Sequence, residues 1–126
     1  MSFASFVVRG LDRIVGRVEV RGPSMEPTLV AGERLLLWRS RRVRIGDVVV
    51  VRDPLAPDRH LVKRVIAIKS DGIELAGDNA GASRDSRDFG VVAKEDLIGR
   101  AWYRYFPASA RGRIDVGAQK DAQNRH

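Results

Sequence analysis

The sequence of 126 residues has no cysteine and only two histidines, and both shortages limit its chemistry. Without cysteine the chain has no disulfides, no thiolate zinc ligands and no cysteine nucleophile. A Ser-His-Asp triad would have to rely on His60, because the other histidine is His126. The remaining common activators of a serine nucleophile are lysine and carboxylate groups.

Long apolar runs are also missing. No stretch approaches the roughly 20 apolar residues of a membrane-spanning helix, and Arg9, Asp12 and Arg13 interrupt the apolar residues near the N-terminus. We therefore expect no transmembrane segment and no secretory signal, and a cytoplasmic or peripherally membrane-associated protein. The length suits one domain with a real core.

Charge is abundant and unbalanced, with 23 Lys+Arg against 16 Asp+Glu and a formal net charge of +7. This balance is typical of a protein that is attracted to anionic lipid or nucleic acid, and also of one whose arginines simply form a solvated basic surface. No nucleic-acid motif or aromatic stacking pattern is present, so we expect no nucleic-acid partner. Residues 3–16 place Phe and aliphatic side chains at helical spacing among basic residues. They predict an amphipathic helix that either docks on its own domain or lies on an anionic membrane surface.

The rest of the chain reads mainly as short strands. Strands are expected at 18–20, 34–38, 48–51, 61–69, 73–76 and 99–106, with a helical turn at 94–97. The run 48–51 is entirely valine, which is typical of a strand buried on both faces. Asp53 to Asp58 should be a loop because it contains two prolines, and Asp71-Gly72 is a hairpin signal. The predicted fold is mainly antiparallel β, with a helix at 1–16, a domain at 17–107 and a disordered polar tail at 108–126.

Ser24 stands out because Gly22, Pro23 and Pro27 stiffen the turn around it. A serine hydroxyl becomes a good nucleophile only when a base takes its proton, and a lysine can do so only when it is neutral. Lys63 shares one face of its strand with Leu61, Val65 and Ala67, and burial there favours the neutral amine. Taken alone, the two residues are also typical of a turn serine and of a lysine whose charged end reaches solvent.

Four segments resemble, in order, the boxes of type I signal peptidases. They are the Ser-Met box at 22–29, the Gly-Asp box at 46–50, the lysine box at 61–65 and the Gly-Asp-Asn box at 77–87. The resemblance covers most of residues 18–106 and implies a signal-peptidase/LexA-like β fold. It also implies a serine endopeptidase that removes an N-terminal leader or pro-segment from a precursor protein.

The resemblance assigns roles by position. Ser24 would attack the scissile carbonyl, Lys63 would be the general base, and Ser83 would orient the lysine. Asp78, Asp85 and Arg87 would brace the site, with an Asp-Arg ion pair as the expected device. Met25, Pro27 and Val20 are expected at the substrate, which would add as a strand next to residues 18–20. The backbone N–H of Ser24 would serve the oxyanion, and Gly22 replaces a serine that supplies a second donor in some members. We expect no cofactor and no metal, since Ala80 and Ala82 stand where calcium ligands would be needed.

The missing anchor, the short linker between Lys63 and Gly77 and the ending at 99–107 resemble a subgroup, the nickel-type superoxide dismutase maturation proteases. A general type I signal peptidase acting on exported proteins is the first alternative. A self-cleaving LexA-like regulatory domain and a non-catalytic binding module for membranes or nucleic acids are the others. The box at 77–87 and the absence of a helix-turn-helix in residues 1–20 argue against the LexA-like reading.

Overall fold

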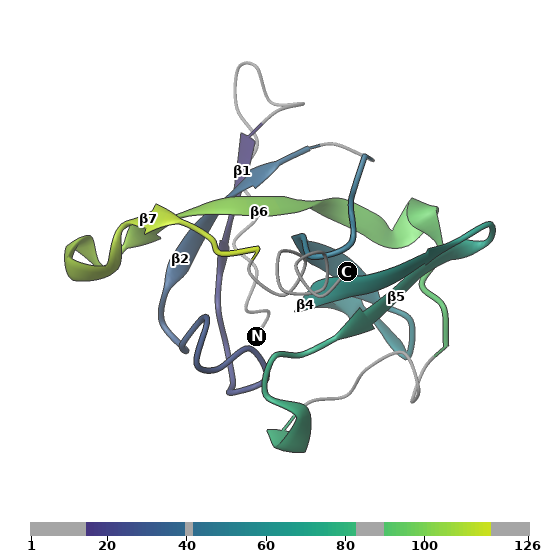
Figure 1. Cartoon of the computed structure of the whole chain (residues 1–126), viewed down its shortest axis with the longest axis horizontal. Helices are drawn as coiled ribbons and strands as arrows, with labels where there is room; N and C mark the ends of the chain where they lie inside the picture. The colour runs from purple at the N-terminus through teal and green to yellow at the C-terminus, as the bar shows by residue number, and fades with distance from the viewer. Residues whose placement is uncertain (1–14, 40–41, 83–89, 117–126) are drawn as a thin grey trace, which may run out of the picture.

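The computed structural model describes residues 15–39, 42–82 and 90–116, and one antiparallel sheet of seven strands dominates them (Figure 1). The strands are β1 (Val15–Glu19), β2 (Arg34–Trp38), β3 (Val48–Asp53), β4 (Ala56–Lys69), β5 (Gly72–Ala76), β6 (Leu97–Phe106) and β7 (Gly112–Arg113). Three short 3₁₀ helices within the described ranges are η1 (Ala80–Ala82), η2 (Lys94–Asp96) and η3 (Ala108–Ala110). The predicted mainly antiparallel β fold is confirmed.

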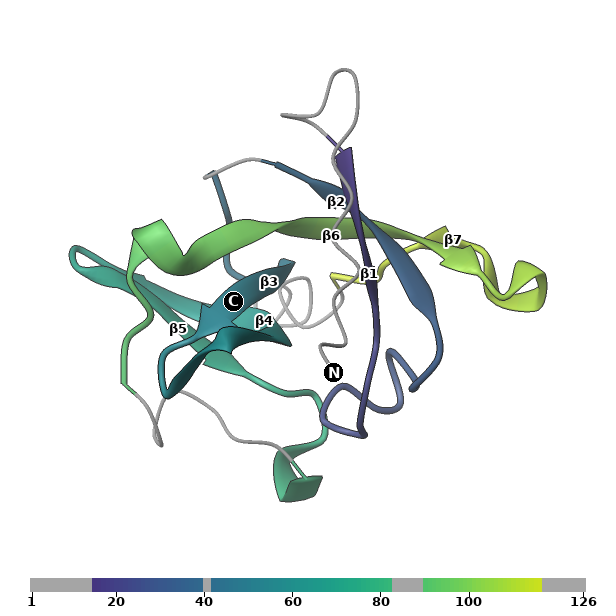
Figure 2. The same cartoon turned by 180° about the vertical axis from the view of Figure 1, so that it is seen from behind.

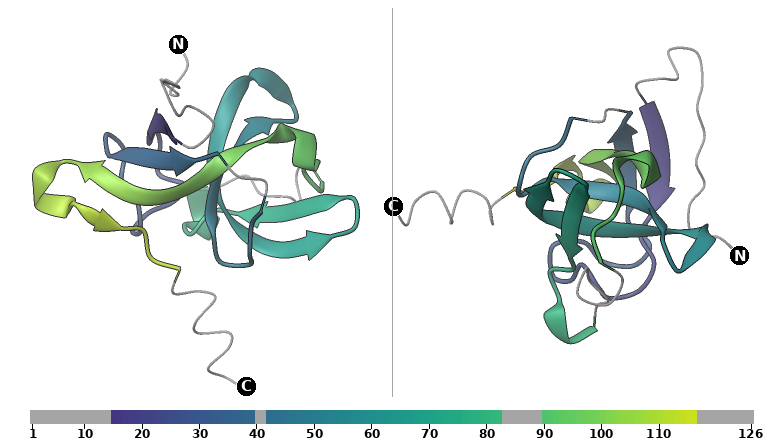
Figure 3. Two further views of the ribbon diagram at one scale, coloured as in Figure 1. Left: turned by 90° about the horizontal axis from the view of Figure 1, so that it is seen from above. Right: turned by 90° about the vertical axis from the view of Figure 1, so that its right-hand side faces the viewer.

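The strand order is β1-β2-β6-β3-β4-β5, with β7 beside β6, so β6 and β3 lie in the middle. Seen from above, β6 runs along the molecule, with β7 toward one end and the β4–β5 hairpin toward the other (Figure 3). The view from behind shows β1 and β2 crossing one half of β6, away from β3, β4 and β5 (Figure 2). The strong twist thus divides the sheet into two halves that share the two central strands.

The valines of β3 connect two hydrophobic clusters on opposite faces of the sheet. Val48 and Val50 pack with buried residues of β1, β2 and the turn that follows β1. Val49 and Val51 pack with buried residues of β4, β5 and the segment around Val92. All four valines are at most 1% exposed, so the strand is buried on both faces, as the unbroken valine run predicts.

The segment expected to be a loop at 53–58 is instead a tight hairpin, and this prediction was wrong. β4 already begins at Ala56, which lies opposite Asp53. The Asp53 side chain accepts a hydrogen bond from the Leu55 N–H at 2.8 Å, so two residues suffice for the turn. Pro57 is tolerated in the strand because β5 pairs with β4 only from Arg64 onward, so that no other described strand pairs with that edge of β4 at Pro57.

The Asp71-Gly72 hairpin is confirmed, with Lys69 opposite Gly72. Glycine is needed there because a Cβ on residue 72 would lie 2.2 Å from the Val92 carbonyl oxygen. The turn expected at 94–97 is present as η2.

The described structure differs from the expected domain limits at both ends. β1 begins at Val15, inside the range expected for the N-terminal helix, and residues 1–14 of that range lie outside the described residues. At the other end, η3 and β7 lie in the range expected for the tail, and Ile114 is only 9% exposed. Its N–H donates to the Trp102 carbonyl at 3.1 Å, so the domain continues through residues 108–116. Residues 117–126 lie outside the described residues.

Across the described parts of the chain, none of the helices has the length and apolar character to span a membrane.

Candidate active site

Ser24 lies in the turn between β1 and β2, and the core holds this turn on both sides of the serine. Val20 before it is 2% exposed, and Met25 and Leu29 after it are 1% and 0% exposed. Gly22 has a φ of +77°, a backbone conformation that side-chain-bearing residues rarely adopt. The buried neighbours and the glycine fix the backbone of the turn, and Ser24 itself is half-buried.

Lys63 lies in β4 and is buried, with 3% exposure. It lies opposite Val49 of β3 in the β3–β4 ladder. Of its neighbours on the same strand face, Val65 belongs to the second hydrophobic cluster and Leu61 packs against it. The apolar surroundings predicted for this lysine are therefore confirmed.

The segment that follows β5 joins the Ser24 turn directly. The Asn79 N–H donates to the Ser24 carbonyl at 2.9 Å, and the Asn79 side-chain amide donates to the Pro23 carbonyl at 3.1 Å. In Figure 1 the β1–β2 turn and the segment after β5 lie at the same end of the molecule. Two segments more than fifty positions apart in the sequence therefore meet at the serine.

Asp78, next to Asn79, forms a two-point ion pair with Arg64. The Arg64 Nε donates to one carboxylate oxygen at 2.8 Å and its Nη2 to the other at 2.7 Å. Thr28, in the Ser24 turn, donates its hydroxyl to the same carboxylate. This ion pair connects the Ser24 turn to β4, while Asp85 and Arg87, the other residues expected to brace the site, lie outside the described residues.

The same contacts set the acidity of Asp78. Burial alone would raise the pKa of its carboxyl group, but the hydrogen bonds from Arg64 and Thr28 and the Arg64 charge together lower the pKa below its usual value. Asp78 is therefore ionised at neutral pH and remains a firm acceptor for both partners.

The register of β4 and β5 places Lys63 close in sequence and in space to this network. Arg64 lies opposite Ala76 in the β4–β5 ladder, so the preceding residue, Lys63, lies level with Gly77. Gly77 begins the segment whose next two residues bind Arg64 and the Ser24 turn. The described contacts thus link Ser24 to Asn79, and they link Lys63 to the same segment through its neighbour Arg64.

Arg64 also binds two carbonyl groups from other parts of the chain. Its Nη1 donates to the Gly46 carbonyl at 2.7 Å and to the Asp115 carbonyl at 2.9 Å. Gly46 belongs to the Gly-Asp box, so Arg64 connects the lysine box to two other boxes. Nearly all of its donor capacity is used, which is what a buried guanidinium requires.

Three predicted site residues, Ser83, Asp85 and Arg87, lie outside the described residues. Two residues expected at the substrate, Met25 and Val20, direct their side chains into the hydrophobic core. The Val20 backbone is also occupied, since its N–H donates to Glu33 and its carbonyl accepts from Gly32. Pro27 is exposed.

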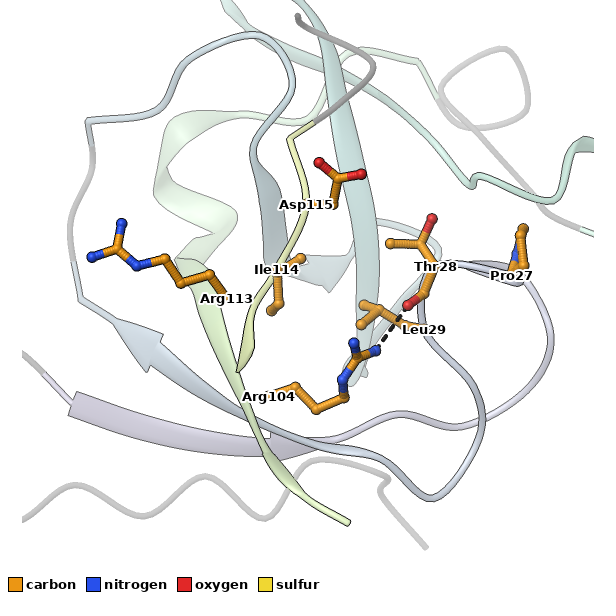
Figure 4. A pocket seen from close by; sticks show the side chains of 7 residues that line it. All are labelled: Pro27, Thr28, Leu29, Arg104, Arg113, Ile114 and Asp115. Atoms are coloured by element: carbon orange, nitrogen blue, oxygen red, sulfur yellow. Dashed lines mark hydrogen bonds between the residues drawn. The ribbon is translucent and has the colours of Figure 1, made fainter. Parts of the chain in front are cut away.

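A cavity of about 260 Å³ lies beside the Ser24 turn rather than at the serine itself (Figure 4). Neither Ser24 nor Lys63 lines it; its walls are Pro27, Thr28, Leu29, Arg104, Arg113, Ile114 and Asp115. Figure 4 shows Arg104 directed at the Thr28 carbonyl, to which it donates at 2.9 Å. Arg104 also donates to Glu33 at 3.0 Å and to the Ala110 carbonyl at 2.7 Å. Arg104 therefore braces the back of the turn.

Sequence reasoning missed Arg64, Thr28 and Arg104 as parts of this site. One signal was present for Arg64: it shares a strand face with Val62, and a charged residue on an apolar face needs a partner. The partners themselves lie 14 and 51 positions away along the chain. No local pattern identifies contacts of that separation.

The chain is thus an antiparallel β domain in which Asp78 joins the Ser24 turn to the lysine-bearing strand β4. Residues 2–79, more than half of the chain, match the family model described as signal peptidase, peptidase S26. The chain belongs to the peptidase S26 family.

Similar proteins include subunits of mitochondrial inner membrane proteases. The chain is 33% identical over 132 residues to the mitochondrial ATP-independent inner membrane protease subunit 2 of Arabidopsis thaliana, covering 82% of this chain and 61% of that protein. It is 34% identical over 124 residues to the mitochondrial inner membrane protease subunit 1 of Schizosaccharomyces pombe, covering 75% and 79%. The corresponding subunit 1 of Homo sapiens is 28% identical over 139 residues, covering 91% and 81%. The chain thus spans about three fifths of the length of the Arabidopsis relative.

Proposed function

We propose that this chain is a serine endopeptidase that removes an N-terminal leader or pro-segment from a precursor protein. Ser24 is the nucleophile and Lys63 the general base. The proposal rests on the contacts of the segment 77–79. Asn79 binds the Ser24 turn, and Asp78 binds Arg64, the residue next to Lys63. Membership in the S26 family supports the same reaction.

In the proposed reaction the Ser24 hydroxyl oxygen attacks the carbonyl carbon of the scissile peptide bond, and the neutral Lys63 amine takes the hydroxyl proton. Lys63 then gives this proton to the departing amine as the C–N bond breaks, which leaves an acyl ester on Ser24. Lys63 next takes a proton from a water molecule that attacks the ester. That proton returns to the Ser24 oxygen, and the carboxyl product leaves.

The negative charge on the carbonyl oxygen needs a donor that is already in place. The Ser24 N–H is the proposed donor, and no hydrogen bond from it to another of the described residues is present. Ser83 is the proposed partner that orients the Lys63 amine, while Asp85 and Arg87 would brace the loop that carries it.

An extended precursor segment would bind by adding a strand to the sheet. β1 leads into the Ser24 turn and pairs only with β2 among the described strands, so its other edge can accept a peptide. With Val20 and Met25 buried, the substrate would contact the β1 backbone and the exposed Pro27.

The relatives are named as inner membrane proteases, which supports processing at a membrane. We propose that the chain is cytoplasmic or peripherally membrane-associated, with residues 3–16 as one contact with an anionic membrane. A nickel-type superoxide dismutase precursor is the narrower substrate proposal. It rests on the sequence features at 99–107, whereas a general signal peptidase would act on exported precursors.

The proposal is tested by mixing the purified chain with candidate precursors, one of each substrate type, and sequencing the N-terminus of any product. Ser24→Ala should abolish cleavage. Lys63→Arg should do the same, because a guanidinium stays protonated and cannot act as a base. Asp58→Asn, a change at an exposed position of the β3–β4 hairpin, is the control that should cleave normally.

Cleavage that survives both Ser24→Ala and Lys63→Ala would contradict the dyad. A first-order reaction that cuts only the chain itself, independent of its concentration, would instead favour the LexA-like alternative.

A further inference from the structure

The turn that carries Ser24 is closed at its base by Glu33. The Glu33 carbonyl accepts from the Val20 N–H at 2.8 Å, just before the turn. The Glu33 carboxylate accepts from the Val30 N–H at 2.9 Å, just after the turn, and the Glu33 N–H donates to the Val30 carbonyl at 3.0 Å. The backbone and side chain of one glutamate therefore hold the two ends of the turn together.

Arg104 of β6 binds both this glutamate and the turn itself. It lies opposite Leu35, which is fully buried, so the Arg104 side chain points into the domain. Its Nη1 donates to the Glu33 carboxylate at 3.0 Å and to the Thr28 carbonyl at 2.9 Å. Its Nε donates to the Ala110 carbonyl at 2.7 Å. The side chains of Arg104 and Glu33 are 21% and 13% exposed, so water competes only weakly for these bonds.

Thr28 is thereby held from two sides. Its hydroxyl donates to Asp78, which is bound to β4, and its carbonyl accepts from Arg104 of β6. Four positions back along the same turn is Ser24, whose carbonyl accepts from the Asn79 N–H. Because the turn is short and closed at its base, a shift of Thr28 would move the Ser24 backbone as well.

Packing alone does not fix this side of the turn. The cavity of about 260 Å³ has Pro27 and Thr28 on one side and Ile114 and Asp115 on the other (Figure 4). The Arg104 guanidinium lies at the wall of this cavity and donates to the Thr28 carbonyl there. Hydrogen bonds from an arginine, rather than contacts between apolar side chains, therefore hold this side of the turn to β6.

From these contacts we infer that Arg104, acting through Thr28 and Glu33, is a positioning residue for the nucleophile. The inference rests on the proposed function, in which Ser24 supplies both the attacking hydroxyl and the N–H that binds the oxyanion. Such groups must be held within about 0.5 Å of their productive positions, and a misplacement of about 1 Å can cost about a hundredfold in rate. Arg104 is not one of the reacting groups, so its loss should slow the reaction without removing any of them.

Acylation of the full chain by a peptide ester separates positioning from binding. In Arg104→Gln we expect the acylation rate constant at saturating ester to fall about tenfold or more, while the ester concentration for half saturation changes less than about threefold. Arg111→Gln is the matched control. Arg111 is exposed and donates to the Tyr105 carbonyl at 3.2 Å, so the control removes the same charge from a neighbouring segment. Both values should then change less than about twofold.

Glu33 and Arg104 should act as one unit. Glu33→Gln keeps a side-chain oxygen for the Val30 N–H but loses the charge that holds the guanidinium, so it should also slow acylation. Combining Glu33→Gln with Arg104→Gln should slow acylation little more than Arg104→Gln alone, because residues in one network are not additive.

The cavity permits a rescue experiment. Arg104→Ala removes the guanidinium and joins the space that it occupied to the cavity. Guanidinium chloride, at concentrations well below those that unfold the chain, should then restore part of the acylation rate. Sodium chloride at the same concentration should not, because it supplies no planar fork of N–H donors. Circular dichroism checks that the variant is folded under the assay conditions.

Amide hydrogen exchange reports the position of the turn without any catalysis. The Asn79 N–H donates to the Ser24 carbonyl, so it should exchange about tenfold faster in Arg104→Gln. The Ile73 N–H donates to the Val92 carbonyl within the second hydrophobic cluster and should exchange as in the unchanged chain.

Three results would overturn the inference. The first is an equal acylation rate in Arg104→Gln and Arg111→Gln. The second is equally faster exchange of Asn79 and Ile73 in Arg104→Gln, which would mean general destabilisation. The third is no greater recovery of Arg104→Ala with guanidinium than with sodium chloride. If the unchanged chain is not acylated at all, the proposed function is contradicted instead, and exchange at Asn79 still decides whether Arg104 holds the turn. Slower acylation at an unchanged half-saturating concentration, with faster exchange at Asn79 alone of the two amides, supports the inference.

Discussion

At the scale of single residues, Asp78 joins the lysine-bearing strand to the Ser24 turn. Its carboxylate accepts from Arg64 at two points and from Thr28, so the β4 strand and the Ser24 turn are fixed against one carboxylate. The side chain of Arg64 is 6% exposed and that of Asp78 17%, which makes the pair mostly shielded from solvent. Removing one partner of such a pair costs more than the pair itself contributes, because a charge remains buried.

Asp78→Asn should therefore lower the free energy of unfolding at neutral pH by about 3 kcal/mol. The native pKa of Asp78 is lowered, so its contribution is fully present above the unfolded pKa, about 4, and is lost as the pH falls through the lower native pKa. The difference between Asp78→Asn and the unchanged chain should shrink in that range. Urea unfolding at neutral and acidic pH measures this. Asp58→Asn, at an exposed position, is the control, and a deficit that is constant with pH would contradict the account.

Gly22 gives a second prediction at this scale. Its φ is +77°, although a Cβ there would meet no atom within 4 Å. Gly22→Ala should cost about 1 to 2 kcal/mol of stability through backbone strain alone. Gly81→Ala, at a glycine without a positive φ, should cost clearly less in the same urea titration. Equal effects would show that the Ser24 turn does not need this conformation.

At the scale of elements, alternation and turn residues predicted the strands well. The Arg34–Trp38 strand matches β2, and the burial of Lys63 in β4 followed from its apolar face neighbours. The Pro54–Pro57 hairpin was missed because proline at an open edge resembles proline in a loop. The Arg64–Asp78 pair and the docking of Ile114 depend on where distant segments meet, and local sequence does not encode that meeting point.

The segment after β6 should contribute to stability, because Ile114 packs into the first hydrophobic cluster. Ile114→Ala should lower the free energy of unfolding by about 2 kcal/mol or more. Val116→Ala, two positions on and 37% exposed, should change it by less than about 0.5 kcal/mol. Denaturant unfolding distinguishes them; equal small effects would mean that residues 108–116 are not part of the stable domain.

At the scale of the whole molecule, β3 and β6 belong to both halves of the sheet, so the two hydrophobic clusters should unfold together. Tryptophan fluorescence reports the β2–β6 half, since Trp38 and Trp102 lie there, whereas far-ultraviolet circular dichroism reports all strands. The two thermal transitions should coincide. Separate midpoints would show that the halves are independent, and the site would then lie between two movable parts.

The proposed endopeptidase is tested most directly by trapping its acyl-enzyme. The purified chain is incubated with an acylating peptide ester, quenched in acid, and its intact mass and the modified residue are determined by mass spectrometry. We predict a gain equal to the acyl group, located on Ser24, absent in Ser24→Ala and strongly reduced in Lys63→Arg. Acylation of Ser24→Ala at the same rate, or precursor cleavage by the unchanged chain with no acyl group ever found on Ser24, would contradict the assignment.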